Sequence, residues 1–200
     1  MQQILVVQSS ARQNGSLSRE YTANLVAKLQ AQHPEAKVVT RDIGANPVPH
    51  LDETLLNGWM KPADQQTDAD RAADARSNEL VDELLASDIV VIGSPMYNFG
   101  ITSTLKAWFD HVLRAGRTFK YTETGPVGLT PDRKVYIVAS RGGRHQGSPL
   151  DHQQPYITTA FGFIGIQDLT FIHVEGQAMG EEEAGKGRAE ADKALSELAA

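Results

Sequence analysis

The sequence predicts an α/β fold in which a five-stranded parallel sheet lies between two layers of helices. Short apolar runs alternate with stretches of helical periodicity along the 200 residues, and such alternation is typical of parallel sheets with right-handed crossovers. One run, residues 89–92, is continuously apolar, as expected of a strand that is buried on both faces. Five strands favour the spatial order 2-1-3-4-5 over the six-stranded order of dinucleotide-binding folds.

The apolar runs predict strands near residues 3–8, 37–41, 89–93, 134–140 and 168–174. Helices are predicted where apolar residues recur every three or four positions. Such spacing covers residues 17–29, residues 80–85 and residues 105–113. A further helix is expected after Gly180, because the three successive glutamates at 181–183 would favour the positive end of a helix.

Three other segments show little periodicity. Residues 43–66 are rich in Pro and Asp, and we interpret them as an insertion within a single domain that spans residues 1–200. Residues 117–131 and 141–155 are longer than simple connections require. We expect both to be loops, in places where a ligand site can be built.

The composition of the chain excludes several kinds of binding partner and site. The formal net charge is −6, whereas nucleic acids and anionic membranes attract clustered Lys and Arg, so we expect neither as a partner. The absence of cysteine excludes disulfides and thiolate metal sites, and it suits a reducing cytoplasm. The chain opens with strand-like residues, which predicts no signal peptide. The six histidines lack paired metal-ligand spacing, so no metal site is predicted.

Residues 9–18 form the first of three loops expected at the carboxyl edge of the sheet, where α/β folds bind ligands. This loop lacks the glycine fingerprints of dinucleotide and nucleoside triphosphate sites. It offers four serine hydroxyls and the amides of a helix N-terminus, which suit a bound phosphate. The alternative is a serine-rich loop that merely caps its helix.

The other two loops follow the third and fourth predicted strands. In Met96-Tyr97-Asn98-Phe99 an aromatic ring can stack on a flat ligand while the amide bonds its polar rim, or the aromatics can simply plug a strand end. The glycines of Ser140-Arg141-Gly142-Gly143 permit close backbone approach, or form an ordinary tight turn. Strands one, three and four are neighbours in the predicted order, so the three loops meet. Together they provide what flavin mononucleotide (FMN) requires.

Several longer motifs occur in one order along the chain. They are Arg41-Asp42 with Asn46-Pro47, Pro95-Met96-Tyr97-Asn98-Phe99, Thr118-Phe119-Lys120-Tyr121-Thr122-Glu123 with Gly125-Pro126, Ser140-Arg141-Gly142-Gly143, and Phe161-Gly162-Phe163-Ile164-Gly165-Ile166. In these motifs the chain resembles, almost end to end, the FMN-dependent NADH-azoreductase (NADH:quinone oxidoreductase) family of bacterial flavodoxin-like flavoenzymes. The resemblance implies a flavodoxin-like fold and a homodimer with one FMN per subunit, each site being partly closed by the other subunit.

The resemblance also implies roles for individual residues. The FMN phosphate would be held by Ser10, Ser16, Leu17 and Ser18. The ring and the ribityl chain would be lined by Met96, Tyr97, Asn98, Phe99, Ser140, Arg141, Gly142 and Gly143. The substrate pocket would include Phe99, Tyr121, Phe163 and Lys61. Lys61 stands where a relative has arginine, and the two cations are not equivalent in stacking or bidentate contact.

The sequence shows no Ser-His-Asp set and no paired catalytic carboxylates, so no catalytic side chain is assigned and the flavin is expected to carry the chemistry. The resemblance implies ping-pong hydride transfer through FMN N5, from NADH to quinones and to aromatic azo compounds. His145, beside Gly143, is either a proton donor or a structural loop residue. A flavodoxin-like electron carrier without small-molecule turnover is the alternative function. The choice between NADH and NADPH stays open.

Overall fold

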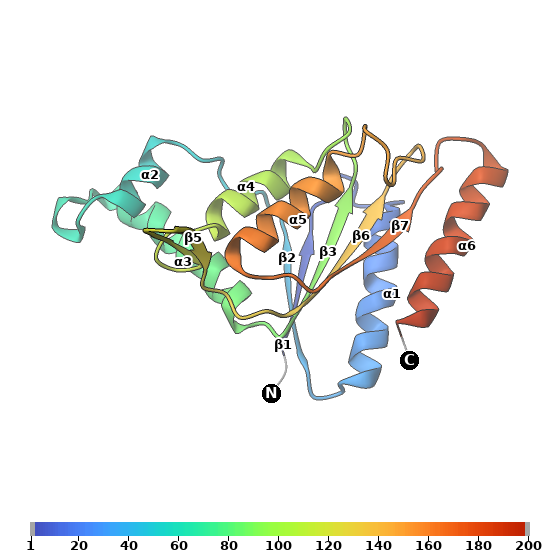
Figure 1. The fold of residues 1–200 in the computed structure, drawn as a ribbon, viewed down its shortest axis with the longest axis horizontal. Coiled ribbons are helices and arrows are strands. Elements are labelled where there is room, and N and C mark those ends of the chain that lie inside the picture. The colour runs from blue at the N-terminus through green and yellow to red at the C-terminus, as the bar shows by residue number, and fades with distance from the viewer. Residues whose placement is uncertain (1–2, 199–200) are drawn as a thin grey trace.

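The computed structural model describes residues 3–198. Its five-stranded sheet is parallel throughout and has the order β2-β1-β3-β6-β7 (Figure 1). The strands are β1 (Gln3–Gln8), β2 (Lys37–Asp42), β3 (Ile89–Pro95), β6 (Lys134–Ser140) and β7 (Leu169–Val174). The predicted strands and their order 2-1-3-4-5 are confirmed, because the two extra strands of a separate hairpin change only the numbering.

Helices cover both faces of the sheet. The α-helices of the described residues are α1 (Leu17–Gln32), α2 (Glu53–Met60), α3 (Asp68–Ala86), α4 (Ser103–Val112), α5 (Gln153–Ile164) and α6 (Glu181–Glu197), and all of them except α2 pack against the sheet. One hydrophobic core joins the sheet to α3, α4 and α5, and a second joins the opposite face to α1 and α6. In Figure 1, α4 and α5 lie in front of the sheet. The architecture is therefore a three-layer sandwich.

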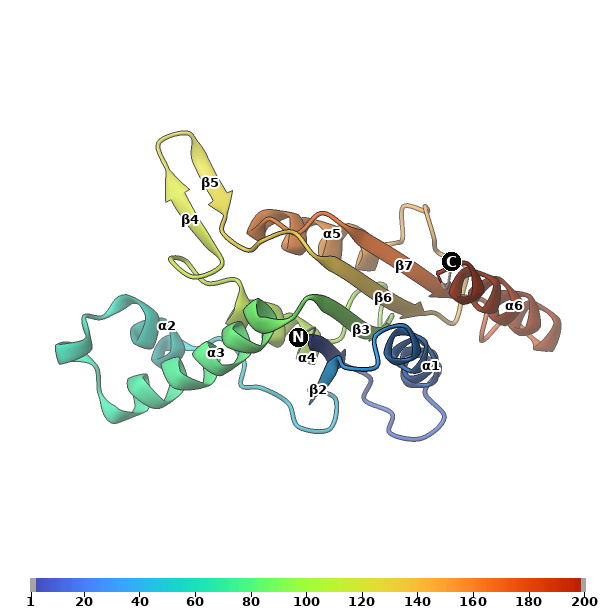
Figure 2. The ribbon, with the colours of Figure 1, turned by 90° about the horizontal axis from the view of Figure 1, so that it is seen from below.

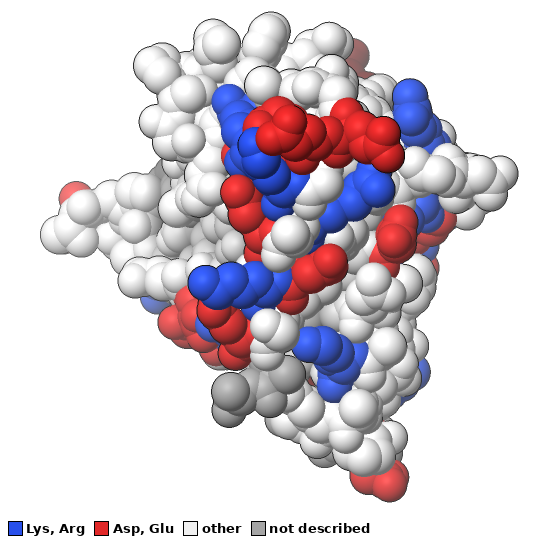
Figure 3. Space-filling model, turned by 90° about the vertical axis from the view of Figure 1, so that its right-hand side faces the viewer, with Lys and Arg blue, Asp and Glu red and all other residues white. Residues whose placement is uncertain are grey.

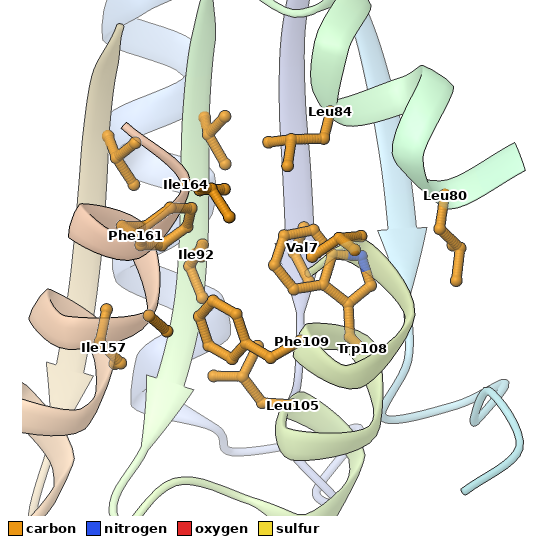
Figure 4. Packing of buried hydrophobic residues seen from close by; sticks show 14 of the residues in the cluster. Val7, Leu80, Leu84, Ile92, Leu105, Trp108, Phe109, Ile157, Phe161 and Ile164 are labelled. Carbon is orange, nitrogen blue, oxygen red and sulfur yellow. The ribbon is translucent and has the colours of Figure 1, made fainter. Parts of the chain in front are cut away.

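The alternation of side chains along β1 explains the two cores. Leu5 and Val7 enter the core under α4, whereas Ile4 and Val6 enter the core under α1, because successive side chains of a strand point to opposite faces. The larger core contains aromatic rings that pack edge to face. The ring of Phe109 lies 5.3 Å from that of Phe161 between centroids, in an edge-to-face arrangement (Figure 4). This core fixes α4 and α5 against the sheet.

Two of the segments expected to be irregular contain regular structure. Residues 43–66 include α2, whose N-cap Asp52 accepts a hydrogen bond from the Leu55 amide at 2.9 Å. Residues 117–131 include the antiparallel hairpin of β4 (Phe119–Thr122) and β5 (Gly125–Gly128). The hairpin strands are only four residues long, too short to show an alternating pattern. In Figure 2 the hairpin and α2 project from the body, away from α6.

Helix α5 was also missing from the sequence prediction, and its first turn occupies the end of the expected 141–155 loop. Its buried residues Ile157, Phe161 and Ile164 do have helical spacing. Pro155 and Gly162 obscure that pattern, since both residues usually interrupt helices. Pro155 is tolerated because it lies in the first turn, where its missing amide has no partner in the helix.

No helix within residues 3–198 combines the length and apolarity needed to cross a membrane. On the face that carries α6, acidic and basic side chains are interleaved (Figure 3). Arg144, in the loop after β6, pairs there with Glu183 at 3.0 Å and with Glu190 at 2.9 Å. Such exposed pairs contribute little to stability.

Two histidines make the stability of the fold depend on pH. Burial lowers the pKa of His111, whose Nε2 lies 3.0 Å from the Pro49 carbonyl oxygen, and burial also lowers the pKa of His173. Below about pH 6.5, the ordinary histidine pKa, the unfolded chain therefore binds protons that the folded chain does not. We expect the Tm to be constant above pH 7 and to fall between about pH 6.5 and 5 in thermal melts. The variant His111→Gln should flatten part of this slope, and an equal slope in the variant would contradict this origin.

Candidate functional site

The neighbouring strands β1, β3 and β6 end at one edge of the sheet, and the loops that follow them line a cleft of ≈ 360 Å³. This volume lies within the usual range for small-molecule sites. Among the residues predicted to bind cofactor, those that line the cleft are Ser10, Ser16, Leu17, Met96, Tyr97, Ser140, Arg141 and Gly142. The structure thus brings together side chains from three loops that are far apart in the sequence.

The end of the cleft at α1 is shaped for an anion. Ser16 is the N-cap residue of α1, yet its side chain makes no capping hydrogen bond. Its hydroxyl lies instead 2.9 Å from the Ser10 hydroxyl and 3.2 Å from that of the buried Ser18. Helices α3 and α4 differ, because Thr67 and Thr102 cap them with side-chain hydrogen bonds. The first amides of α1 therefore stay available to an anion, which the helix dipole also favours.

The backbone of Ser10 is fixed by contacts to its carbonyl group from Arg19 and Gly44. Arg19 donates from Nη2 to the Ser10 carbonyl at 2.9 Å and forms a bidentate pair with Asp42 at 2.6 and 2.8 Å. The hydrogen bond from Arg19 lowers the pKa of Asp42, so this carboxylate remains charged at neutral pH. A Cβ on Gly44 would lie 2.1 Å from the Ser10 carbonyl oxygen. Only glycine fits there, and the loop is thereby fixed before any ligand arrives.

The turn after β3 is strained. Tyr97 and Gly100 exchange two backbone hydrogen bonds of 3.1 Å, and the residues between them have positive φ, 49° for Asn98 and 70° for Phe99. These features define a type I′ turn, which asparagine tolerates. For an aromatic residue the left-handed conformation costs roughly 1–2 kcal/mol. Phe99 is 48% exposed, so burial of its ring does not offset the cost of this backbone conformation. An exposed, strained aromatic beside a cleft indicates a ligand contact.

The turn after β6 contributes main-chain groups to the cleft. The Arg141 side chain is 0% exposed and forms ion pairs with Asp151 at 2.9 Å and Glu175 at 3.0 Å, so this residue meets the cleft through its main chain. The carbonyls of Gly142 and Gly143 accept hydrogen bonds from the loop after β7. Within residues 3–198, the amides of both glycines donate to no protein acceptor. Gly142 lines the cleft and Gly143 follows it directly, so this turn offers backbone donors at or next to the wall of the cleft.

Three of the residues predicted for the substrate pocket lie away from the cleft of their own chain. Helix α5 begins beside Phe99, where the His152 amide donates to the Phe99 carbonyl, and Phe163 follows about ten residues later, roughly 15 Å along the helix. Tyr121, on the hairpin, is 74% exposed. Both rings pack against Phe119, at 5.4 Å from Tyr121 and 4.6 Å from Phe163 between centroids.

Lys61, the C-cap residue of α2, is the third. Its ammonium group lies 3.0 Å from the Asp70 carboxylate, which is itself buried. Its charge is therefore already paired within the chain. The fourth, Phe99, is not among the residues that line the cleft, but it belongs to the same turn as Tyr97, which does. Its ring lies 5.9 Å from that of His145 between centroids.

The cleft also contains residues that the sequence analysis did not assign to the site individually, although two of them lie within the predicted loop of residues 9–18. They are Arg12, Gly15, Pro95, Gln177 and Ala178. Gln177 and Ala178 follow β7, and their amides donate to the carbonyls of Arg141 and Gly142 at 3.2 and 2.8 Å. Because β7 is the neighbour of β6, the strand order contained this signal. Arg12 adds a cation at the cleft, within the loop that precedes α1.

The fold and the cleft define a flavodoxin-like protein with a ligand site at the carboxyl edge of its sheet. A family model described as the flavodoxin-like fold matches residues 2–199. The FMN-dependent NADH:quinone oxidoreductase of Azotobacter vinelandii is 55% identical over 199 residues, covering 100% of both chains. The FMN-dependent NADH:quinone oxidoreductase 2 of Pseudomonas fluorescens Pf0-1 is 53% identical with the same coverage.

Two solved structures of azoreductases are also similar to this chain. An azoreductase from Bacillus anthracis Sterne has a TM-score of 0.90 at 28% identity, covering 100% of this chain and 99% of its own. An FMN-dependent NADH-azoreductase from Bacillus anthracis Ames Ancestor, solved in complex with FMN, has a TM-score of 0.86 at 25% identity, covering 99% and 100%. The chain belongs to the family of FMN-dependent NADH:quinone oxidoreductases, and the resemblance predicted from its motifs is confirmed.

Proposed function

We propose that the protein binds FMN in the cleft and uses it to reduce quinones, and aromatic azo compounds, with NADH as the electron donor. The uncapped N-terminus of α1, with its cluster of serine hydroxyls, is the observation that carries this proposal. The names of the relatives support it as well, since they are FMN-dependent NADH:quinone oxidoreductases. A cytoplasmic location is part of the proposal, and the cysteine-free composition supports it.

The residues of the cleft suit the parts of FMN. Ser10, Ser16 and Ser18 with the first amides of α1 would bind the phosphate. At the opposite wall, the free amides of Gly142 and Gly143 would donate to the polar edge of the ring and stabilise negative charge there. The assignments for Leu17, Met96, Asn98, Ser140 and the Arg141 main chain belong to the same proposal.

When bound, FMN would supply the two-electron hydride chemistry, and the proposed cycle is ping-pong, with NADH as the donor and two turns needed for an azo bond. The side chains of the protein would position the aromatic acceptor beside the cofactor and shield both from water. Tyr97 and Phe99, exposed at the turn after β3, offer flat apolar surface on which an aromatic acceptor can stack. His145 is held beside Phe99 by its own amide, which donates to Glu175 at 2.8 Å.

The proposal includes a homodimer in which the hairpin of each subunit closes the pocket of the other. Tyr121 and Phe163 lie far from the cleft of their own chain, yet Tyr121 is highly exposed. Other large apolar side chains are exposed on the hairpin and on α2, namely Leu56, Met60 and Val127. Exposed apolar surface of this kind is typical of a contact with another protein. In this arrangement Lys61, on the same side of the molecule, would also face the partner.

The variant Phe163→Ala is expected to raise the KM for quinone acceptors with little change in bound FMN. The lost ring contact corresponds to about 1–2 kcal/mol, or roughly 5- to 30-fold in kcat/KM. Steady-state kinetics with menadione and the flavin-to-protein absorbance ratio measure the two effects separately. Loss of flavin together with an unchanged acceptor profile would contradict the pocket assignment.

The proposed function is tested by the absorption spectrum of the purified protein, by identification of the released flavin, and by NADH oxidation with menadione. We expect a yellow protein that releases FMN and oxidises NADH only when a quinone is present in anaerobic buffer. A yellow protein without turnover would support the electron-carrier alternative. A protein that binds no FMN even when it is added in excess would refute the proposal, and parallel assays with NADPH determine donor preference.

A further inference from the structure

A cluster of buried charges lies directly behind the turn that follows β6. Arg141 has a fully buried side chain, paired with Asp151 at 2.9 Å and with Glu175 at 3.0 Å. Its Nε also donates to the Gln153 side-chain oxygen at 3.0 Å, and Nε2 of Gln153 in turn donates to the carbonyl of Ser94 in β3 at 2.7 Å. Buried ion pairs contribute little to stability compared with apolar residues of the same size. The cluster therefore invites a functional explanation.

Glu175, just beyond the end of β7, is the centre of this arrangement. One of its oxygens, Oε1, accepts hydrogen bonds from Arg141 Nη1 at 3.0 Å, from the His145 amide at 2.8 Å and from the Gln146 amide at 2.9 Å. These bonds hold both ends of the segment that contains Gly142 and Gly143. A single carboxylate thus determines the course of the backbone at one wall of the cleft.

The cluster carries net negative charge, because it contains one guanidinium and two carboxylates. Burial raises the pKa of Glu175, but the hydrogen bonds from the His145 and Gln146 amides and from Arg141 outweigh burial and leave the pKa below its ordinary value. Glu175 is therefore ionised at neutral pH. A buried negative charge disfavours the gain of further negative charge nearby.

We propose that Glu175 is a positioning residue with two effects on the cofactor: its hydrogen bonds hold the Gly142–Gly143 amides toward the cleft, and its charge keeps the reduction potential of bound FMN low. This inference rests on the proposed function. The two effects are separable, because the carbonyl oxygen of a glutamine still accepts hydrogen bonds but carries no net charge.

The test compares Glu175→Ala, which removes acceptor and charge, with Glu175→Gln, which removes the charge alone. In flavin-free protein, amide hydrogen exchange at His145 and Gln146 should be at least about tenfold faster in Glu175→Ala, because these amides lose their charged acceptor. The Kd for FMN should also rise by about tenfold or more, which is the fold-change that corresponds to one lost charge-assisted hydrogen bond. Glu175→Gln should restore both values to within about threefold of the parent protein, as a retained acceptor predicts. In spectroelectrochemical titration the midpoint potential of its FMN should nevertheless be more positive than in the parent.

Glu190→Gln is the matched control, since Glu190 pairs with Arg144 of the same segment at 2.9 Å but has an exposed side chain on α6. It should change none of the three measurements. An unchanged exchange rate in Glu175→Ala, or an unchanged potential in Glu175→Gln, would overturn the proposal. If Glu175→Ala does not fold, the potential of Glu175→Gln decides. If the parent protein binds no FMN, the proposed function fails, while the exchange rates of the flavin-free variants still decide the positioning role.

Discussion

Replacement of Ser16 and Ser18 together by alanine is expected to raise the Kd for FMN by two to four orders of magnitude. Each hydroxyl that bonds the phosphate contributes about 1.5–3 kcal/mol, and the sum of two such bonds corresponds to roughly 10²- to 10⁴-fold. The fold should survive, because Ser16 makes no capping hydrogen bond that α1 would lose. Alanine is also the best helix former for the position of Ser18 inside α1. Titration of the apoprotein, followed by quenching of FMN fluorescence, measures the effect.

Thr102→Ala provides the converse control at the same edge of the sheet. The Thr102 hydroxyl does cap its helix, accepting from the Leu105 amide at 3.1 Å. Its loss should lower the unfolding free energy by about 1 kcal/mol without changing the affinity for FMN. If the serine variant keeps its FMN affinity, or if both variants lose it equally, the phosphate does not bind at α1.

Gly187→Ala is expected to destabilise the fold by about 3 kcal/mol, at the upper end of overpacking effects. Gly187 lies in α6 where the helix meets the end of β7, and a Cβ there would stand 1.9 Å from the Glu175 carbonyl oxygen. Backbone at that position cannot move aside as a flexible side chain would. Helix α6 must therefore shift away from the sheet and from Glu175. Urea denaturation of the two proteins measures the difference.

Gly185→Ala is the matched control, two residues earlier in the same helix. A Cβ on Gly185 would meet nothing within 4 Å. Because alanine is favoured over glycine inside helices, this variant should be neutral or more stable by about 0.5–1 kcal/mol. Equal stability of the two variants would show that α6 does not pack against the Glu175 backbone as described.

The central sheet could be predicted because its strands are buried on both faces. Residues such as Val90 and Ile92 leave no ambiguity, and the neighbour relation of β1, β3 and β6 then brings three loops to one edge. The chemistry of the cleft follows from that relation. The serines before α1 and the glycines after β6 were therefore found from sequence, since strand order alone determines that they meet.

Other features depend on contacts that no local pattern encodes. The hairpin is short and largely solvent-exposed, so apolar alternation is absent from it. The arginine of the Ser-Arg-Gly-Gly motif looks available to a ligand, but Asp151 and Glu175, distant in sequence, bury its side chain. Likewise, the resemblance implied that Tyr121 and Phe163 line a substrate pocket. Their distance from the cleft of their own chain follows only from the course of the hairpin and the length of α5.

The most direct test of this account is a crystal structure of the protein grown with FMN. We expect the phosphate to lie within hydrogen-bond distance of the Ser16 and Ser18 hydroxyls, and the ring to lie between Tyr97 and the amides of Gly142 and Gly143. A flavin bound at any other place in the chain, or this edge of the sheet empty in crystals of protein that binds FMN in solution, would contradict it.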